Sequence, residues 1–265
     1  MIFTVKKYFN YQMIRIPVRT FGAARIIISV RHYSKPYTKY FETDPIINGY
    51  DTIKVKIPKM PPAVVVEIYN EANGNLDFDS TFKIGDVQVE PIKQMFSISK
   101  IMDNNVNSFA EFSDDFAENA GILSAQNSVY ISPDGKFRID YKDVIRDENG
   151  KELRTPARIN TKSGIIEIAK KHYISYTVPG RKAINWHEFS HLWRNVNASD
   201  EIEADKNAVL IYLGMGNPTI EAYNVFLRVF KNTPSELNRN RYNEMNSFIK
   251  NFHNNVNNYL SKGVS

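Results

Sequence analysis

The chain has 265 residues, 42% of them hydrophobic, with 34 basic and 29 acidic residues and no cysteine. This length and composition predict one large or two modest globular domains, and the lack of cysteine excludes disulfides and thiolate metal ligands. No apolar run is long enough to span a bilayer, and residues 1–10 lack the apolar core of a signal peptide. We therefore expect no membrane association and a reducing compartment, either the cytoplasm or a particle assembled there.

Positive charge is concentrated at the start of the chain. Residues 1–41 contain eight of the 34 basic residues and no acidic residue, so the remainder carries a net charge of −3. Tyrosine and phenylalanine are interleaved with these basic residues, as in an arm that docks onto a protein partner or a second copy of the chain. The alternative is a set of strands with charged outer faces and aromatic inner faces. A nucleic-acid partner is disfavoured, because the basic residues are spread out rather than clustered.

Short β-strands are expected through the rest of the first 95 residues. Residues 25–30 are rich in β-branched side chains, and residues 52–57 alternate between apolar residues and lysine, which is typical of a half-buried strand. Three further strands are predicted between turn sequences, at residues 63–69, 82–84 and 87–92. This succession predicts a small β-sandwich or barrel-like module over residues 1–95, with the basic, aromatic arm at residues 1–41.

Residues 96–265 mix helices and strands, which makes the predicted fold class α+β. Residues 106–119 have helical periodicity, with Phe109, Phe112 and Phe116 on one face. Short strands are expected next, at residues 129–131, 137–144, 157–159 and 165–169. Helices are expected after them, at residues 182–194, 201–213, 217–230 and 235–260. The second predicted domain therefore ends in a long C-terminal helix.

His187, Glu188 and His191 form an H-E-x-x-H motif in the first of these later helices. Two histidines four residues apart lie on the same side of a helix and can bind one ion, and neutral imidazole is a good zinc ligand. Glu188 lies beside that ion without needing to bind it, as a general base for a metal-activated water must. The alternative is a buried helix whose two histidines only form hydrogen bonds.

The helix predicted from residue 201 carries the other candidate ligands. The polar residues 197–200 predict a tight turn that packs this helix against the first. Glu201 can supply a third ligand, with Glu203 as the alternative, and Asp205 can accept the outer N–H of a ligand histidine. Acidic residues are also favoured at a helix N-terminus by the macrodipole, which accounts for the first turn better than for Asp205.

The sequence HEFSH followed by EIEAD resembles the H-E-x-x-H … E-x-x-A-D signature of gluzincin zinc metallopeptidases. It is similar to the CAAX prenyl protease/HtpX-like and ImmA/IrrE-like families and to metallopeptidases encoded by bacteriophages. The resemblance covers about residues 155–230 and implies a zincin-like domain, with His187, His191 and Glu201 as zinc ligands. The interval to Glu201 is shorter than usual in these families, and Ser190 stands where glycine is common.

The resemblance also implies where a substrate would bind. In zincin-like folds the strand before the histidine helix forms the sheet edge above the metal, which assigns residues 165–169 to that edge. A peptide can add to such an edge as a further strand. Candidate oxyanion or substrate-binding groups come from the loop predicted at residues 172–181 and from later helices; they are His172, Tyr173, Tyr176, Tyr223 and Tyr242.

Two functions of different classes follow from the sequence. The first is zinc-dependent hydrolysis of peptide bonds, with Zn²⁺ as cofactor, a protein or peptide as substrate and Glu188 as general base. The second is a structural component of a phage virion or other assembly, whose metallopeptidase-like domain holds a structural zinc or has lost its metal. In that case the arm at residues 1–41 would contact other virion proteins. A fold and a motif do not by themselves decide between these functions.

Overall fold

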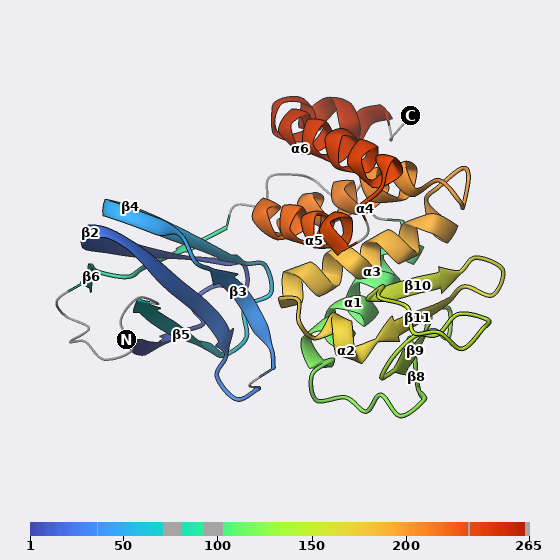
Figure 1. The fold of residues 1–265 in the computed structure, drawn as a ribbon, viewed down its shortest axis with the longest axis horizontal. Coiled ribbons are helices and arrows are strands. Elements are labelled where there is room, and N and C mark those ends of the chain that lie inside the picture. Colours follow the sequence, from blue (N-terminus) through green and yellow to red (C-terminus); the bar gives the residue numbers. More distant parts are fainter. Residues whose placement is uncertain (36, 71–80, 93–102, 233, 263–265) are drawn as a thin grey trace. The chain divides into compact units, whose positions relative to one another are not determined.

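The computed structural model describes residues 1–35, 37–70, 81–92, 103–232 and 234–262 (Figure 1). The chain forms two compact units. The first contains Met1–Lys93 with Gly216–Pro218, and the second contains Gln94–Met215 with Thr219–Ser265. The domain boundary predicted between residues 95 and 96 lies outside the described residues.

The N-terminal unit is a seven-stranded antiparallel sheet. Its strands are β1 (Ile2–Lys6), β2 (Gln12–His32), β3 (Lys39–Thr43), β4 (Ile46–Ile57), β5 (Ala63–Asn70), β6 (Phe82–Ile84) and β7 (Gln88–Pro91). The long strand β2 connects the whole sheet. Its first half pairs with β4 on one side and with β6 and β7 on the other, and its second half pairs with β5 and β3.

The sequence predicts a basic, aromatic arm of the β-rich module at residues 1–41, with a set of strands as the alternative, and the described residues of this segment belong largely to strands. This segment forms β1, β2 and part of β3, and it runs through the centre of the sheet. Alternate residues of its first half, including Ile14, Ile16 and Val18, are fully buried, while the residues between them face outward. The inner face is therefore aliphatic, whereas aromatic residues such as Phe21 and Tyr33 are exposed. Buried side chains alternate with outward-facing ones in the first half of β2, which is the period-two pattern of a β-strand with one face in the core.

The second unit combines a four-stranded sheet with six helices. The sheet order is β10-β11-β9-β8, and the strands are β8 (Ser128–Ile131), β9 (Arg138–Lys142), β10 (Ala157–Asn160) and β11 (Ile165–Ala169). The helices are α1 (Asn104–Asn119), α2 (Lys170–Tyr173), α3 (Val178–Trp193), α4 (Glu201–Gly214), α5 (Thr219–Asn232) and α6 (Glu236–Lys262). Helix α3 contacts α1, α4, α5 and β10, so it lies between the sheet and the later helices (Figure 1). The mixed content agrees with the predicted α+β class.

The sheet of the second unit corrects one expectation. Residues 165–169 form β11, which pairs with β10 on one side and, in parallel, with β9 on the other. Strand β11 is therefore an inner strand, and β10 is the edge strand. A hairpin at Gly164, with a backbone φ of +72°, folds β10 back along β11. The resemblance placed the edge one strand too late because sequence order does not reveal which neighbour a strand will have.

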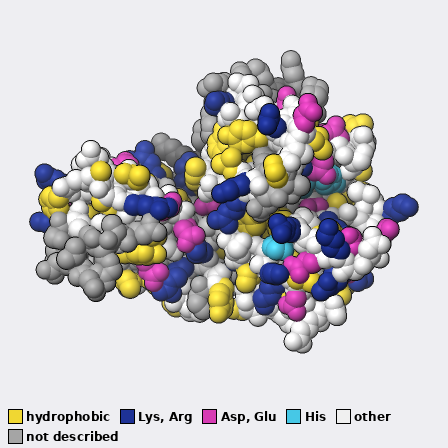
Figure 2. All heavy atoms as spheres, in the orientation of Figure 1, with side chains coloured by type: hydrophobic (Ala, Val, Ile, Leu, Met, Phe, Trp, Pro, Cys, Tyr) yellow, Lys and Arg dark blue, Asp and Glu magenta, His cyan; other side chains and the backbone are white. Residues whose placement is uncertain are grey.

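No helix in the described part of the chain combines the length and the apolar character needed to cross a bilayer. In the space-filling view, basic and acidic side chains are interspersed over the visible described surface (Figure 2).

Candidate metal centre

Helix α3 holds the two histidines in place through its opposite side. The helix begins after Thr177, whose hydroxyl accepts a hydrogen bond from the N–H of Gly180 at 3.2 Å. This start is four residues earlier than predicted, because Thr177 and Pro179 form a stronger N-terminal signal than the residues near 182. Trp186 and Phe189 are fully buried, and the Phe189 ring stacks on Phe109 of α1 at 4.5 Å. Packing on this side fixes the rotation of α3 and hence the direction of the histidines.

Helix α4 brings the third donor to the same place. Asp200 caps the helix by accepting hydrogen bonds from the N–H groups of Ile202 and Glu203 at 2.9 and 3.0 Å, and Glu201 is the first helical residue. Ala204 is fully buried. Such a small side chain permits the close approach of α4 to α3. The predicted turn back between the two helices is thus present.

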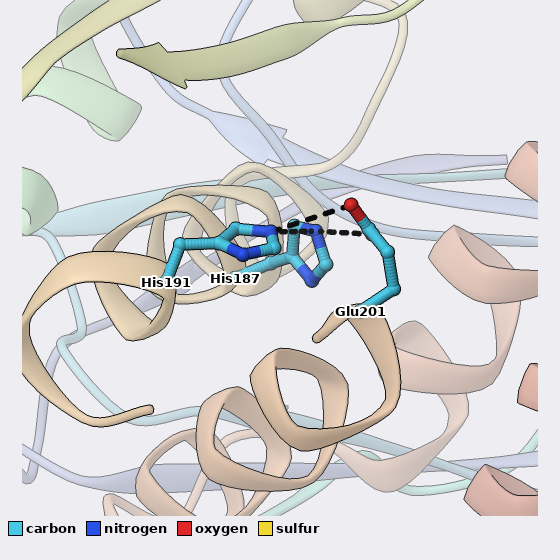
Figure 3. A group of neighbouring side chains, drawn as sticks. All are labelled: His187, His191 and Glu201. Carbon is cyan, nitrogen blue, oxygen red and sulfur yellow. Dashed lines mark hydrogen bonds and ion pairs between the residues drawn. The ribbon is translucent and has the colours of Figure 1, made fainter. Parts of the chain in front are cut away.

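The donor atoms of His187, His191 and Glu201 converge on one point (Figure 3). The two Nε2 atoms are 3.1 Å apart. The Glu201 carboxylate oxygens lie 3.4 Å from Nε2 of His187 and 3.7 Å from Nε2 of His191. These three residues could hold a metal ion, and no other such group occurs among the described residues.

The structure distinguishes Glu201 from Glu203, which the sequence left open. The Glu203 carboxylate accepts hydrogen bonds from the N–H groups of Val196 and Asn197, at 2.9 and 3.3 Å. Glu203 therefore stabilises the turn between α3 and α4, with its side chain directed away from the histidines. The third donor is Glu201.

The second ring nitrogen of each histidine, Nδ1, lies close to an oxygen atom on the side away from the donors. Nδ1 of His187 lies 2.9 Å from Oδ1 of Asp205, within ion-pair distance but without hydrogen-bond alignment, and Nδ1 of His191 lies 2.8 Å from the carbonyl oxygen of Ala198. A carbonyl can only accept, so Nδ1 of His191 carries the proton and Nε2 presents its lone pair to the site. Acceptors of this kind fix the tautomer and orientation of ligand histidines.

Arg241 is the part of the site that sequence analysis missed. Its guanidinium binds both oxygens of Asp205, at 2.8 and 2.9 Å, and also lies 3.0 Å from Oε2 of Glu201. Arg241 lies on α6, 36 residues after Asp205. No spacing rule connects residues this far apart, so only the packing of α6 on α4 reveals the contact.

Glu188 lies beside the three donors and is almost completely buried. Burial raises the pKa of its carboxyl to about 7, an effect that neighbouring Glu201 reinforces and that His187 opposes. A backbone hydrogen bond from Ile159 of β10 also reaches this carboxylate. Glu188 is therefore a carboxylate that can exchange a proton near neutral pH.

The other charges of the site favour a cation at its centre. Burial alone would lower the pKa of His187, but the carboxylates of Asp205 and Glu201 outweigh burial and raise this pKa to about 10. Burial likewise would raise the pKa of Glu201, but His187 and Arg241 hold it at about 2. Burial lowers the pKa of His191, and the neighbouring His187 lowers it further. Without an ion, the site therefore stabilises positive charge on His187, in the place that a metal would occupy.

The donors open into a cavity of about 330 Å³. One wall is the edge strand β10 with the residues on either side of it. The opposite wall is apolar and comes from α3 and α5; it contains Ala183, Ile184, Val225 and Phe226. Arg241 also lines the cavity.

Five other candidates from the sequence do not line this cavity: His172, Tyr173, Tyr176, Tyr223 and Tyr242. Tyr173 is fully buried, and its hydroxyl donates to Oδ1 of Asn185 at 2.8 Å. Residues 172–181 contain the end of α2 and the start of α3, and Tyr176 lies buried between these helices. Tyr223 lies on α5 and Tyr242 lies on α6. The structure therefore does not bring them together with the metal ligands.

Comparison of the chain with models of known protein families and with curated proteins gave no match.

Proposed function

We propose that the protein is a zinc-dependent peptidase with a zincin-like second unit of the gluzincin type. The observation that carries the proposal is the convergence of His187, His191 and Glu201 in a cavity that also contains the buried carboxyl of Glu188. A structural hydrogen-bonded histidine pair explains neither the third donor nor the adjacent carboxyl group.

The donor set fits zinc in type and in spacing. Two imidazole nitrogens and one carboxylate oxygen are a common ligand set of catalytic zinc sites, which leave a fourth position open to water or substrate. Ligand atoms about 2.0–2.1 Å from a tetrahedral zinc are about 3.3 Å from one another. The separations of 3.1, 3.4 and 3.7 Å between the donors here are close to that value. The cavity of about 330 Å³ beside the donors is large enough to hold part of a substrate.

The chemistry divides between the ion and the chain. Zinc bound at this position supplies a Lewis acid that makes water a nucleophile near neutral pH and polarises a substrate carbonyl. Glu188 accepts the proton of the attacking water and delivers it to the leaving amine, a role for which its place in the cavity beside the donors suits it. Asp205, itself held by Arg241, keeps His187 in one orientation throughout.

Substrate binding is assigned to the edge strand β10 and the apolar wall. An extended peptide can pair with the edge of β10 that no described strand covers, beside the cavity that β10 lines. This role replaces the one expected for residues 165–169. A side chain next to the scissile bond would then lie against Ile184 and Phe226.

The proposal predicts that the purified chain contains one equivalent of zinc and cleaves denatured protein mixtures. Glu188→Gln should keep the zinc, because Glu188 is not a ligand, and should lower kcat by about 10²–10⁴-fold, because the general base is lost. The measurements are elemental analysis and cleavage with and without a chelator. The matched control is Glu111→Gln, which removes an exposed carboxylate of α1 that does not line the cavity. Undiminished cleavage by Glu188→Gln would refute the assignment.

A structural role for the metal has a distinct result in the same experiment. Stoichiometric zinc without any cleavage, together with a fall in the melting temperature on chelation, would indicate a virion or assembly component with a structural site.

A further inference from the structure

The N-terminal unit presents five cations on one face of its sheet. They are the outward side chains of β2, β4 and β6, and we call them the basic face: Arg15, Arg19, Lys54, Lys56 and Lys83. The register places Arg15 opposite Lys54 and Arg19 opposite Lys83. Cross-strand partners lie on the same side of a sheet, and residues at i and i+2 do so too. Cross-strand neighbours are therefore about 5 Å apart. Along the strands, Lys54 and Lys56 are about 7 Å apart, and Arg15 and Arg19 are about 14 Å apart.

The basic face has little compensating negative charge. Among the described residues, the carboxylate of Glu90 on β7 pairs with Arg15. Within the described residues, no ion pair is formed by the other four cations. The same unit does pair cations elsewhere, as in Arg31 with Glu67 and Lys39 with Glu42. Among the described residues, four cations of the basic face therefore lack the carboxylate partners that cations elsewhere in the unit have.

Such an arrangement costs folding stability. Like charges directly opposite each other in an antiparallel pair are destabilising, and Arg15 and Lys54 are such a pair. An anionic ligand with several charges would relieve the repulsion. On the other face of the same strands, the side chains of Ile14, Ile16 and Val55 are fully buried in the hydrophobic core.

The side chains on the basic face favour phosphate over an acidic protein. Three of the five cations are lysines, which protein–protein interfaces disfavour and phosphate contacts commonly use. Two exposed aromatic rings flank them: Phe21 is 56% exposed and Tyr50 is 69% exposed. Tyr50 is the cross-strand partner of Arg19, and the Lys83 ammonium lies 5.8 Å from the centre of the Phe21 ring. Cations interleaved with exposed rings are typical of surfaces that bind single strands through phosphates and stacked bases.

We propose that the basic face binds single-stranded nucleic acid. This inference is independent of the peptidase site. The sequence had disfavoured such a partner because its basic residues are spread along the chain. The antiparallel register brings residues 15, 19, 54, 56 and 83 onto one surface.

The test is fluorescence anisotropy of a labelled 20-nucleotide oligo-dT with the full chain, over a range of salt concentrations. Neutralising both lysines of β4, Lys54→Gln with Lys56→Gln, should weaken binding at low salt about 10-fold or more. It should also reduce the slope of log K against log salt by about 1.4. Tyr50→Ala should weaken binding about 10-fold with little change in that slope. The control is Lys136→Gln with Lys162→Gln, which removes the same charge from exposed positions of the second unit.

Two further measurements separate the outcomes. The Lys54→Gln change should leave the melting temperature equal or higher, because it removes a repulsion, so lost binding cannot be attributed to unfolding. Equal binding by the two double variants would overturn the proposal. Poly-glutamate binding as tightly as the oligonucleotide, with the same salt slope, would also overturn it and assign the face to an acidic protein.

Discussion

At the scale of single residues, the geometry of the candidate metal centre depends on the groups that contact the second ring nitrogens of its histidines. Asp205 is completely buried and contacts both His187 and Arg241. A buried carboxylate with two cationic neighbours holds both in fixed positions, because moving either would leave a charge unpaired. The orientation of His187 therefore depends on a residue of α6 that does not itself bind the ion.

Asp205→Asn should lower zinc affinity about 10–100-fold, because the neutral amide holds His187 less firmly and makes its imidazole a weaker ligand. The measurement is competition with a chromophoric chelator at neutral pH. The control is Glu111→Gln, an exposed carboxylate on α1, for which we expect unchanged affinity. Melting curves of the metal-free variants show whether any loss reflects unfolding. Equal zinc affinity in the two variants would contradict the role of Asp205.

At the scale of elements, the second unit joins helices to its sheet through polar contacts as well as through its core. Asp134, in the turn between β8 and β9, accepts hydrogen bonds from the hydroxyls of Ser108 on α1 and Ser132, at 2.6 and 2.7 Å. These two bonds, with one from the Lys136 backbone, lower the pKa of Asp134 from 3.8 to about 2. One carboxylate thus connects the turn to α1.

The lowered pKa of Asp134 predicts a pH dependence of stability. Its contribution is fully present above the unfolded-state pKa near 4 and is lost as the pH falls through about 2. Asp134→Asn should therefore melt below the wild type at pH 7, and the difference should shrink between pH 4 and pH 2. Melting curves at several pH values measure this. Asp140→Asn, at an exposed ion pair of the adjacent strand, is the control. A difference that grows on acidification would contradict the prediction.

At the scale of the whole molecule, two units with separate cores carry separate features. The N-terminal core is aliphatic and centred on β2, while the core of the second unit is rich in aromatic side chains around Phe109, Trp186 and Phe189. The metal donors and the cavity belong to the second unit, and the basic face belongs to the first.

This division predicts two unfolding transitions, only one of which responds to zinc. A ligand at 100 times its Kd stabilises the unit that binds it by about 2.7 kcal/mol. For a unit of this size that corresponds to a rise in melting temperature of roughly 5–10 °C. Calorimetry with zinc and with a chelator measures both transitions, and Phe109→Ala should lower the zinc-sensitive one. Equal shifts of both transitions would contradict the assignment.

The sequence by itself determined the local features: the helix that carries His187 and His191, the cap that starts α4 before Glu201, and the α+β class. Each depends on side chains only a few residues apart, where helical spacing and capping fix the geometry.

Only the tertiary structure decided the features that depend on contacts between residues far apart in the sequence. It placed β10 rather than β11 at the sheet edge, assigned residues 1–41 largely to strands, and selected Glu201 over Glu203. It also brought Arg241 to Asp205 across 36 residues and five cations onto one face. Strand neighbours and helix packing follow from burial of the whole core, and no local pattern in the chain specifies them.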